Sequence, residues 1–153
     1  MVTKQVAVFD YGSGNVRSVV NALRHIGVDA QLTSDFSTCM QVDGLVVPGV
    51  GAFASVMADL RSRRGDILID RRLAGGRAVL GICVGMQIMF ERGIEHGEDV
   101  LGLGGMAGNS REAERSDCPP YGLVKAGSGG GVLPIFRNRG RTFLFCTLLR
   151  GVS

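Results

Sequence analysis

A cysteine between two glycines is the strongest chemical signal in this sequence. The segment Gly81–Gly85 has the sequence Gly-Ile-Cys-Val-Gly, directly after the apolar run 78–80 and directly before Met86–Phe90. A nucleophile between small residues at a strand-to-helix junction is typical of a nucleophile elbow, in which the backbone is strained and the side chain stands clear of the sheet. The N–H groups at the start of the following helix favour a thiolate. We therefore predict that Cys83 is exposed and reactive.

The other three cysteines lack these surroundings. Cys39, Cys118 and Cys146 are far apart and show neither the paired spacing of a zinc site nor the density of a secreted disulfide scaffold. We expect reduced thiols that are buried and inert, as cysteines commonly are. The spacing indicates no metal site.

Two glycine-containing loops could share a site with Cys83. Gly49-Val50-Gly51 follows an apolar run and could place backbone N–H groups around an oxyanion, although such a pair is also common in plain turns. Tyr11–Asn15 contains Gly12-Ser13-Gly14, which could be a phosphate loop, but Arg17 occupies the place of the third glycine of a dinucleotide fingerprint. We favour an oxyanion role for the first loop and disfavour dinucleotide binding by the second.

Neither histidine is a convincing base for Cys83. His25 lies near the end of a predicted helix, where a cation meets the helix dipole favourably, so a structural role is expected. His96 lies among Glu95, Glu98 and Asp99 in a predicted surface loop.

The elements that must position these residues alternate between strand and helix. Apolar runs predict strands, and apolar residues at helical spacing predict helices. Strands are expected at 6–10, 29–32, 44–48 and 78–82, and helices at 16–26, 53–60, 67–73 and 84–92. This order is typical of a parallel sheet covered on both faces, an α/β fold of three layers. Its loops at the carboxyl ends of the strands should converge on Cys83.

Bulk properties limit the class of protein. A chain of 153 residues with 45% hydrophobic residues can build one sizeable core. The sequence shows no membrane-length apolar run and no signal peptide, so we expect a cytoplasmic protein that does not bind a membrane. Residues 1–104 carry 10 basic and 11 acidic residues, whereas residues 105–153 carry 7 and 3. The net charge of +3 therefore comes from the tail and does not indicate nucleic-acid binding.

Three motifs in this order resemble the class I glutamine amidotransferases. They are Phe9–Asn15 (Phe-Asp-Tyr-Gly-Ser-Gly-Asn), Val47–Phe53 (Val-Pro-Gly-Val-Gly-Ala-Phe) and Leu80–Gln87 (Leu-Gly-Ile-Cys-Val-Gly-Met-Gln). Within the family, the resemblance is to glutaminase subunits of histidine biosynthesis. It implies that Cys83 attacks the side-chain amide of glutamine, forms a glutamyl thioester and releases ammonia, without a cofactor.

The resemblance also implies roles for other residues. Gly49, Val50, Gly51 and Val84 would form the oxyanion and substrate site, and Gln87 would help hold glutamine. Tyr11, Gly12 and Asn15 would lie near a cyclase (synthase) subunit, the partner that uses the ammonia.

The second half of the sequence departs from the family. It contains neither the His-Pro-Glu segment that supplies the family's general base nor its Pro-His-Met-Gly-Trp motif. Codons compatible with Pro119–Val124 encode Pro-His-Met-Gly-Trp one base later, and 105–110 and 142–151 allow similar matches in the same frame. We hypothesise a single-base frameshift near 103–105 and a truncated chain, in which 1–104 form the α/β half of the fold and 105–153 an aberrant Gly-rich basic tail.

Three functional hypotheses follow from these observations. The first is a glutaminase subunit, impaired because the His and Glu of the triad are absent. The second is a non-catalytic interaction module that keeps the sheet and the partner-facing surface. The third is a different hydrolase with a cysteine elbow, which would need a histidine. With the fold incomplete at its C-terminus, we also expect an unpaired sheet edge and poor solubility.

Overall fold

The computed structural model describes residues 4–95, 97–109, 123–125, 132–138 and 141–146, with side chains described as far as residue 105. Strands and helices alternate through the first half of the chain, as the apolar pattern predicts. The helices are α1 (Val16–His25), α2 (Phe36–Gln41), α3 (Phe53–Ser62), α4 (Gly65–Ala74) and α5 (Val84–Gln87). The strands are β1 (Gln5–Phe9), β2 (Asp29–Thr33), β3 (Gly44–Gly49), β4 (Ala78–Cys83), β5 (Phe90–Glu95), β6 (Glu98–Leu101), β7 (Met106–Asn109), β8 (Leu123–Lys125), β9 (Val132–Asn138) and β10 (Arg141–Cys146).

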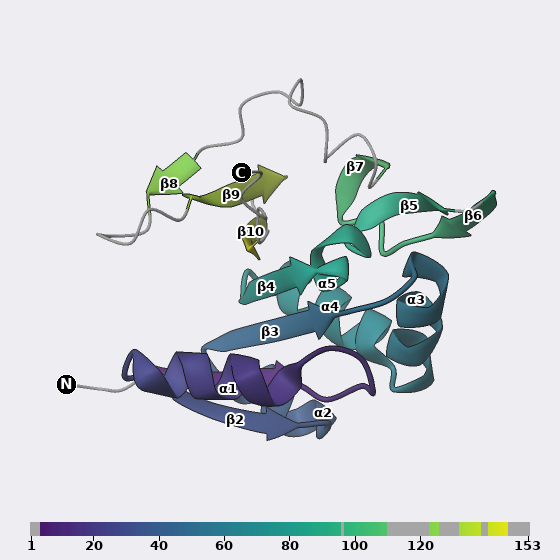
Figure 1. Ribbon diagram of the computed structural model, residues 1–153. Coiled ribbons are helices and arrows are strands. Elements are labelled where there is room, and N and C mark those ends of the chain that lie inside the picture. The colour runs from purple at the N-terminus through teal and green to yellow at the C-terminus, as the bar shows by residue number, and fades with distance from the viewer. Residues whose placement is uncertain (1–3, 96, 110–122, 126–131, 139–140, 147–153) are drawn as a thin grey trace, which may run out of the picture.

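The main sheet has the strand order β2-β1-β3-β4-β10-β9-β8. The neighbours from β2 to β10 pair in parallel, and β9 and β8 continue the sheet in antiparallel fashion. A second sheet, of order β6-β5-β7, lies beyond the carboxyl end of β4 (Figure 1). The parallel α/β class predicted from the sequence is confirmed.

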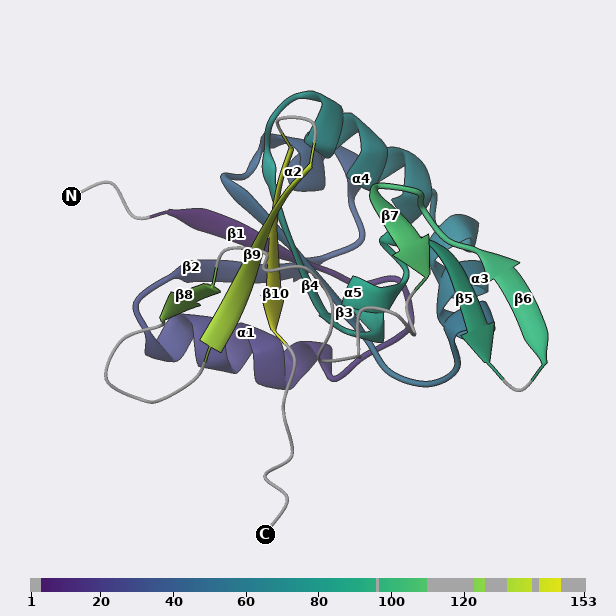
Figure 2. The ribbon, with the colours of Figure 1, turned by 90° about the horizontal axis from the view of Figure 1, so that it is seen from above.

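Helices cover both faces of the parallel strands, which confirms the three layers. Figure 2 shows α1 on one side of the sheet and α2 and α4 on the other. On the α1 side, Val20 packs with Val8 and Val46 from the sheet. The larger cluster on the opposite side includes Met57 of α3 and Leu68 of α4. Apolar strands buried on both faces are the expected consequence of this arrangement.

The helix predicted over 84–92 is wrong beyond its first turn. It ends at Gln87, and Phe90–Glu95 form β5. Ile88, Met89 and Phe90 are all buried, which an amphipathic helix with one solvent-facing side cannot achieve. The carbonyls of this stretch instead accept hydrogen bonds from the segment 102–104, with the N–H of Leu103 donating to the carbonyl of Ile88.

The short helix α2 was not predicted. It begins after Asp35, whose carboxylate accepts a hydrogen bond of 2.7 Å from the backbone N–H of Thr38. An aspartate at this position satisfies one of the unpaired N–H groups of the first helical turn. This hydrogen bond holds the pKa of the Asp35 carboxyl below its ordinary value.

An unpaired sheet edge was expected after the last predicted strand, but the edge of β4 is paired. Residues 141–146 form β10, which pairs in parallel with β4 from Val79 to Ile82 and in antiparallel fashion with β9. Strand β10 therefore has neighbours on both sides. No helix in the described part of the chain is long and apolar enough to cross a membrane.

One buried arginine joins the second layer of helices to the sheet. Arg72 of α4 has no exposed surface, and its two terminal nitrogens donate to the carbonyls of Cys39, Val42, Asp43 and Ala78 at 2.6–3.2 Å. These carbonyls belong to the end of α2, the approach to β3 and the start of β4. A single guanidinium thus satisfies four backbone acceptors from three segments.

Candidate functional site

Cys83 occupies a strained turn between β4 and α5. Its φ of 55° and ψ of −125° lie in a region that residues with a Cβ rarely adopt, and its side chain is exposed. This is the geometry of a nucleophile elbow, so the predicted exposure and backbone strain are confirmed. The helix that follows is only four residues long. Its dipole is correspondingly weak, and the exposed elbow is what presents the sulfur.

The glycines on both sides of Cys83 are required by close backbone packing. A Cβ at Gly81 would lie 2.6 Å from the Cα of Met86, and a Cβ at Gly85 would overlap the carbonyl of Val47. Real Cβ atoms do not approach backbone atoms this closely. The two glycines therefore allow the backbone of α5 to pack directly against β4 and β3, and this packing fixes the position of Cys83 relative to the sheet.

The loop predicted to line an oxyanion hole lies directly beside Cys83. Gly49 is the register partner of Cys83 across the β3–β4 ladder, and a Cβ at Gly49 would lie 2.5 Å from the backbone nitrogen of Gly85. Gly51 has a φ of +109°, a conformation that favours glycine. Val50, between them, is 57% exposed. Val50 and Gly51 are therefore exposed next to the nucleophile elbow, whereas Gly49 is buried.

The Tyr11–Asn15 loop holds this oxyanion segment in place. The buried Tyr11 hydroxyl donates to the carbonyl of Pro48. Ser13 Oγ donates to the carbonyl of Val50 at 3.1 Å and accepts from the N–H of Val50 at 3.3 Å. The three loops therefore meet at the carboxyl edge of the sheet, as predicted. In this arrangement the N–H of Val50 points to Ser13.

Tyr11 is a buried member of this loop, and its role at a partner interface stays a prediction. Its side chain is 2% exposed and stacks on the ring of Phe9, at a centroid distance of 5.5 Å. Burial raises the pKa of the Tyr11 hydroxyl above its ordinary value. Gly12 and Asn15 are the exposed members of the loop. Of the three residues predicted to face a partner, Gly12 and Asn15 therefore reach the surface, while the Tyr11 hydroxyl holds the carbonyl of Pro48.

Two further predicted residues lie on α5. Val84 directly follows the nucleophile and is buried, and Gln87 is half-buried one helical turn after Cys83. Residues four apart on a helix share a face, so Gln87 belongs to the turn that presents the sulfur.

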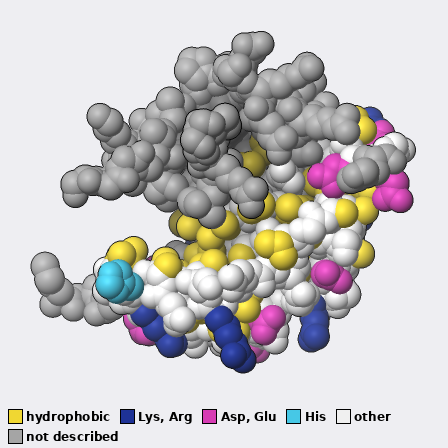
Figure 3. All heavy atoms as spheres, viewed as in Figure 1, with side chains coloured by type: hydrophobic (Ala, Val, Ile, Leu, Met, Phe, Trp, Pro, Cys, Tyr) yellow, Lys and Arg dark blue, Asp and Glu magenta, His cyan; other side chains and the backbone are white. Residues whose placement is uncertain are grey.

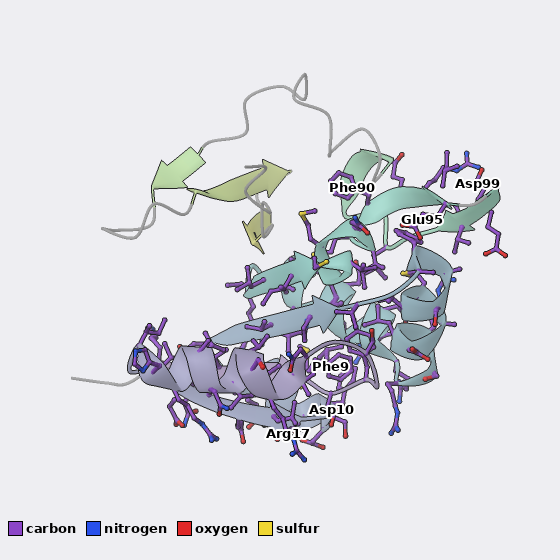
Figure 4. All side chains as sticks on the ribbon, viewed as in Figure 1. Phe9, Asp10, Arg17, Phe90, Glu95 and Asp99 are labelled. Atoms are coloured by element: carbon purple, nitrogen blue, oxygen red, sulfur yellow. The ribbon has the colours of Figure 1, made fainter. Side chains whose placement is uncertain are left out.

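The sequence interpretation missed a pocket next to the oxyanion segment. It has a volume of about 240 Å³ and is lined by Ala52, Phe53, Ala54, Gly93, Glu95, Glu98 and Val100. Glu95 was predicted to lie in a surface loop. It ends β5 instead, and its carboxylate accepts a hydrogen bond of 2.9 Å from the N–H of Phe53 at the start of α3 (Figure 4).

The two acidic residues of this pocket face each other across a hairpin. Glu95 is the register partner of Glu98 in the β5–β6 ladder, and Asp99 follows. Figure 3 shows acidic side chains gathered at this edge of the molecule. The hydrogen bond from the Phe53 N–H to Glu95 links this pocket to the end of the oxyanion segment, but it depends on β5, which the sequence pattern did not reveal.

Other candidate residues lie away from the site. His25 is exposed at the end of α1. Because α1 runs back from the carboxyl end of β1, His25 lies at the amino ends of the parallel strands, whereas Cys83 lies at their carboxyl ends. His96 and Cys118 lie outside the described residues, and the side chain of Cys146 is not described. Cys39 is buried, as predicted, and burial raises the pKa of its thiol to about 11. The described residues contain no group of three or more His, Cys, Asp or Glu side chains that could hold a metal ion.

Comparison with known proteins gives one consistent family. The family model described as glutamine amidotransferase class-I matches residues 7–134. The imidazole glycerol phosphate synthase subunit HisH of Streptomyces avermitilis is 53% identical over 128 residues, which are 84% of this chain and 60% of that protein. The protein of the same name from Leifsonia xyli is 61% identical over 103 residues, covering 67% of this chain and 49% of that protein. The chain thus spans about half to three-fifths of these relatives.

A solved structure agrees with the fold. A protein described as a glutamine amidotransferase aligns over 92% of this chain and 87% of its own, with a TM-score of 0.59. Its sequence identity is 19%, so the likeness shows the architecture alone.

Proposed function

Because the chain belongs to the class I glutamine amidotransferases, we propose that it is the glutaminase subunit of an imidazole glycerol phosphate synthase. In this role it releases ammonia from glutamine for imidazole ring formation in histidine biosynthesis. The observation that carries the proposal is the exposed Cys83 elbow, in register with Gly49 of the oxyanion segment. The relatives from Streptomyces avermitilis and Leifsonia xyli support the choice within the family.

The geometry suits acyl transfer to sulfur. The Cys83 thiolate attacks the side-chain carbonyl carbon of glutamine, and the tetrahedral oxyanion is stabilised by the N–H of Val84 and by N–H groups of 49–51. Of these, the Val50 N–H must first leave Ser13 Oγ, to which it donates in this structure. Collapse of this intermediate breaks the C–N bond and releases ammonia, with water supplying the proton to the leaving nitrogen. Water then attacks the glutamyl thioester, which yields glutamate and regenerates the thiol. Gln87, one turn from Cys83, would help hold the substrate.

We propose that the pocket lined by Glu95 and Glu98 binds the α-amino end of glutamine, the end opposite the side-chain amide. Glu95 and Glu98 place two carboxylates beside the start of α3, which directly follows the oxyanion segment. Carboxylates attract an ammonium group, and the α-ammonium of glutamine is the cation that the reaction brings to this site. The partner would be the cyclase subunit of the synthase, which would meet the exposed Gly12 and Asn15 of the neighbouring loop.

An electrophilic glutamine analogue tests directly whether Cys83 reacts with glutamine, as the glutaminase hypothesis requires. The analogue 6-diazo-5-oxo-norleucine should add to one thiol of the native chain, and peptide mass mapping should place it on Cys83. Cys83→Ser should abolish the addition, whereas Cys39→Ser should leave it unchanged because Cys39 is buried. Iodoacetamide provides the reference for a folded, accessible thiol. Modification of Cys83 by iodoacetamide but not by the analogue would refute glutamine recognition.

A non-catalytic interaction module is the second candidate. Two observations favour it. The Val50 N–H donates to Ser13, and His25, the one histidine in the described part of the chain, lies far from Cys83. A general base typically contributes ~10²–10⁴ to the rate. Binding of the cyclase subunit without ammonia release from glutamine by the complex would select this candidate, whereas turnover would select the glutaminase.

A further inference from the structure

The side chain of Tyr11 continues the contact between β1 and β3 where the pairing of their backbones ends. The β1–β3 pairing ends at Val46, whereas the β3–β4 pairing continues to Gly49, the partner of Cys83. The Tyr11 hydroxyl donates to the carbonyl of Pro48, beyond the last β1–β3 pair. The segment that follows β1 therefore holds the end of β3 that leads into the oxyanion segment.

The loop and the nucleophile elbow meet at the peptide group between Pro48 and Gly49. A Cβ at Gly14 would lie 3.0 Å from the Cβ of Pro48, so the loop backbone packs directly against the proline. A Cβ at Gly49 would lie 3.1 Å from the Tyr11 hydroxyl oxygen and 2.5 Å from the backbone nitrogen of Gly85. The tyrosine hydroxyl and the first turn of α5 therefore both approach Gly49.

The Tyr11 side chain is itself firmly held. It is buried, its ring stacks on that of Phe9 with 28° between the two planes, and both rings belong to the larger core cluster. Burial raises the pKa of the hydroxyl, so it keeps its proton at neutral pH and remains a donor. A peptide group is planar and rotates as one unit, so a carbonyl bonded to a fixed donor restrains the whole group. Tyr11 therefore restrains the orientation of the Pro48–Gly49 peptide group.

The next peptide groups of the oxyanion segment are held more weakly. One hydroxyl, that of Ser13, bonds both the N–H and the carbonyl of Val50, at 3.3 and 3.1 Å. Val50 is exposed, whereas Pro48 is buried. The exposed side chain leaves room for the Val50 N–H to turn away from Ser13, as stabilisation of an oxyanion requires. The segment thus has a fixed end at Pro48 and a freer end at Val50.

We propose that Tyr11 is a positioning residue for the reaction of Cys83 with glutamine. Its hydroxyl keeps the Pro48–Gly49 peptide group still and in register with Cys83 while the N–H of Val50 turns toward the oxyanion. Tyr11 acts only through the backbone that follows Pro48. This role rests on the proposed glutaminase function, because that reaction produces the oxyanion.

Tyr11→Phe in the full chain tests this role, because it removes the hydroxyl and keeps the ring that stacks on Phe9. The labelling of Cys83 by 6-diazo-5-oxo-norleucine is followed at several analogue concentrations. One donor to an oxyanion contributes about 10²–10³ to the rate, so a displaced segment should lower the limiting rate of labelling by about tenfold. The analogue concentration that gives half the limiting rate should change by less than about twofold, because ground-state binding does not use the hydroxyl. The rate with iodoacetamide should stay the same.

Three further variants separate positioning from a general loss of structure. Tyr121→Phe removes the other tyrosine hydroxyl of the chain and should leave every rate unchanged. Val20→Ala lowers the melting temperature through the core on the α1 side of the sheet, and it should also leave the limiting rate unchanged. Tyr11→4-aminophenylalanine retains a donor, an N–H in place of the O–H, and should restore the limiting rate to within about threefold of wild type. This variant also provides the test if Tyr11→Phe does not fold.

The outcomes distinguish the role of Tyr11 from the glutaminase function. A limiting rate of Tyr11→Phe within about twofold of wild type, or an equal decrease in Val20→Ala, would overturn the role of Tyr11 and leave the function standing. A limiting rate of Tyr11→4-aminophenylalanine about tenfold below wild type would overturn it as well. If the wild-type chain reacts with iodoacetamide but not with the analogue, the glutaminase function fails, and the role of Tyr11 fails with it.

Discussion

At the scale of single residues, Ser13 has the most direct control over the nucleophile's surroundings. Its hydroxyl bonds both the N–H and the carbonyl of Val50, and so fixes the orientation of two successive peptide groups in the oxyanion segment. An N–H that donates to Ser13 is not available to an oxyanion at Cys83. The side chain at position 13 therefore sets the resting arrangement of the site.

Ser13→Ala should speed the modification of Cys83 by an electrophilic glutamine analogue. Removal of the hydroxyl frees the Val50 N–H, and a hydrogen bond of ~1 kcal/mol corresponds to about a fivefold change in rate. The rate of labelling, normalised to that of iodoacetamide, measures the effect without interference from thiol accessibility. A slower reaction of the variant would mean that Ser13 supports the active arrangement.

At the scale of elements, the sequence predicted what local patterns control. The parallel strands and α1, α3 and α4 follow from apolar runs and helical spacing, and the loop convergence at Cys83 follows from their parallel order. Strand β5 was missed because Ile88–Phe90 are buried on all sides, which erases the period that separates helix from strand. Helix α2 was missed although Asp35 is a typical N-cap. Glu95 could not be placed in the site without β5.

Asp35→Asn should lower the melting temperature of the chain at neutral pH. The folded state holds the pKa of this carboxyl below its unfolded value of about 3.9, so the charged form contributes stability above that value. The contribution is lost as the pH falls through the lower folded pKa. The difference in melting temperature between wild type and variant should therefore shrink on acidification; a constant difference would exclude the charge as its origin.

Arg72→Met should destabilise the fold by about 3 kcal/mol or more, because four backbone carbonyls lose their donor while the site stays buried. Denaturant titration measures the free energy of unfolding. The exposed Arg63→Met serves as the control and should change it by less than about 0.5 kcal/mol. Equal effects of the two substitutions would show that the buried bonds contribute little.

At the scale of the whole molecule, a division of the chain near residue 104 stays a prediction. We propose that a change of reading frame near 103–105 separates the amidotransferase half from the sequence that follows. Sequencing of the coding DNA tests this proposal. A shifted frame that contains stop codons before a His-Pro-Glu segment would rule it out.

The second sheet gives a specific origin for the expected poor solubility. In the described part of the chain, β6 has a strand neighbour on one side only, and its Leu101 is 65% exposed. An edge strand with an exposed apolar residue is a template for pairing between molecules. Leu101→Lys should therefore reduce the average mass seen by light scattering at high concentration. Ile26→Lys, at an exposed helix end, should not; an equal reduction would point to general charge effects.

The burial of Tyr11 gives the molecule an optical reporter of its own site. The chain has no tryptophan and only two tyrosines, of which Tyr121 lies outside the described residues. Tyrosine fluorescence is therefore not masked by tryptophan. The Tyr11 hydroxyl donates a hydrogen bond to the carbonyl of Pro48, the residue directly before the oxyanion segment 49–51. With Tyr121→Phe to isolate the signal, the fluorescence of one residue would follow movement of that segment during ligand or partner binding, without any attached dye.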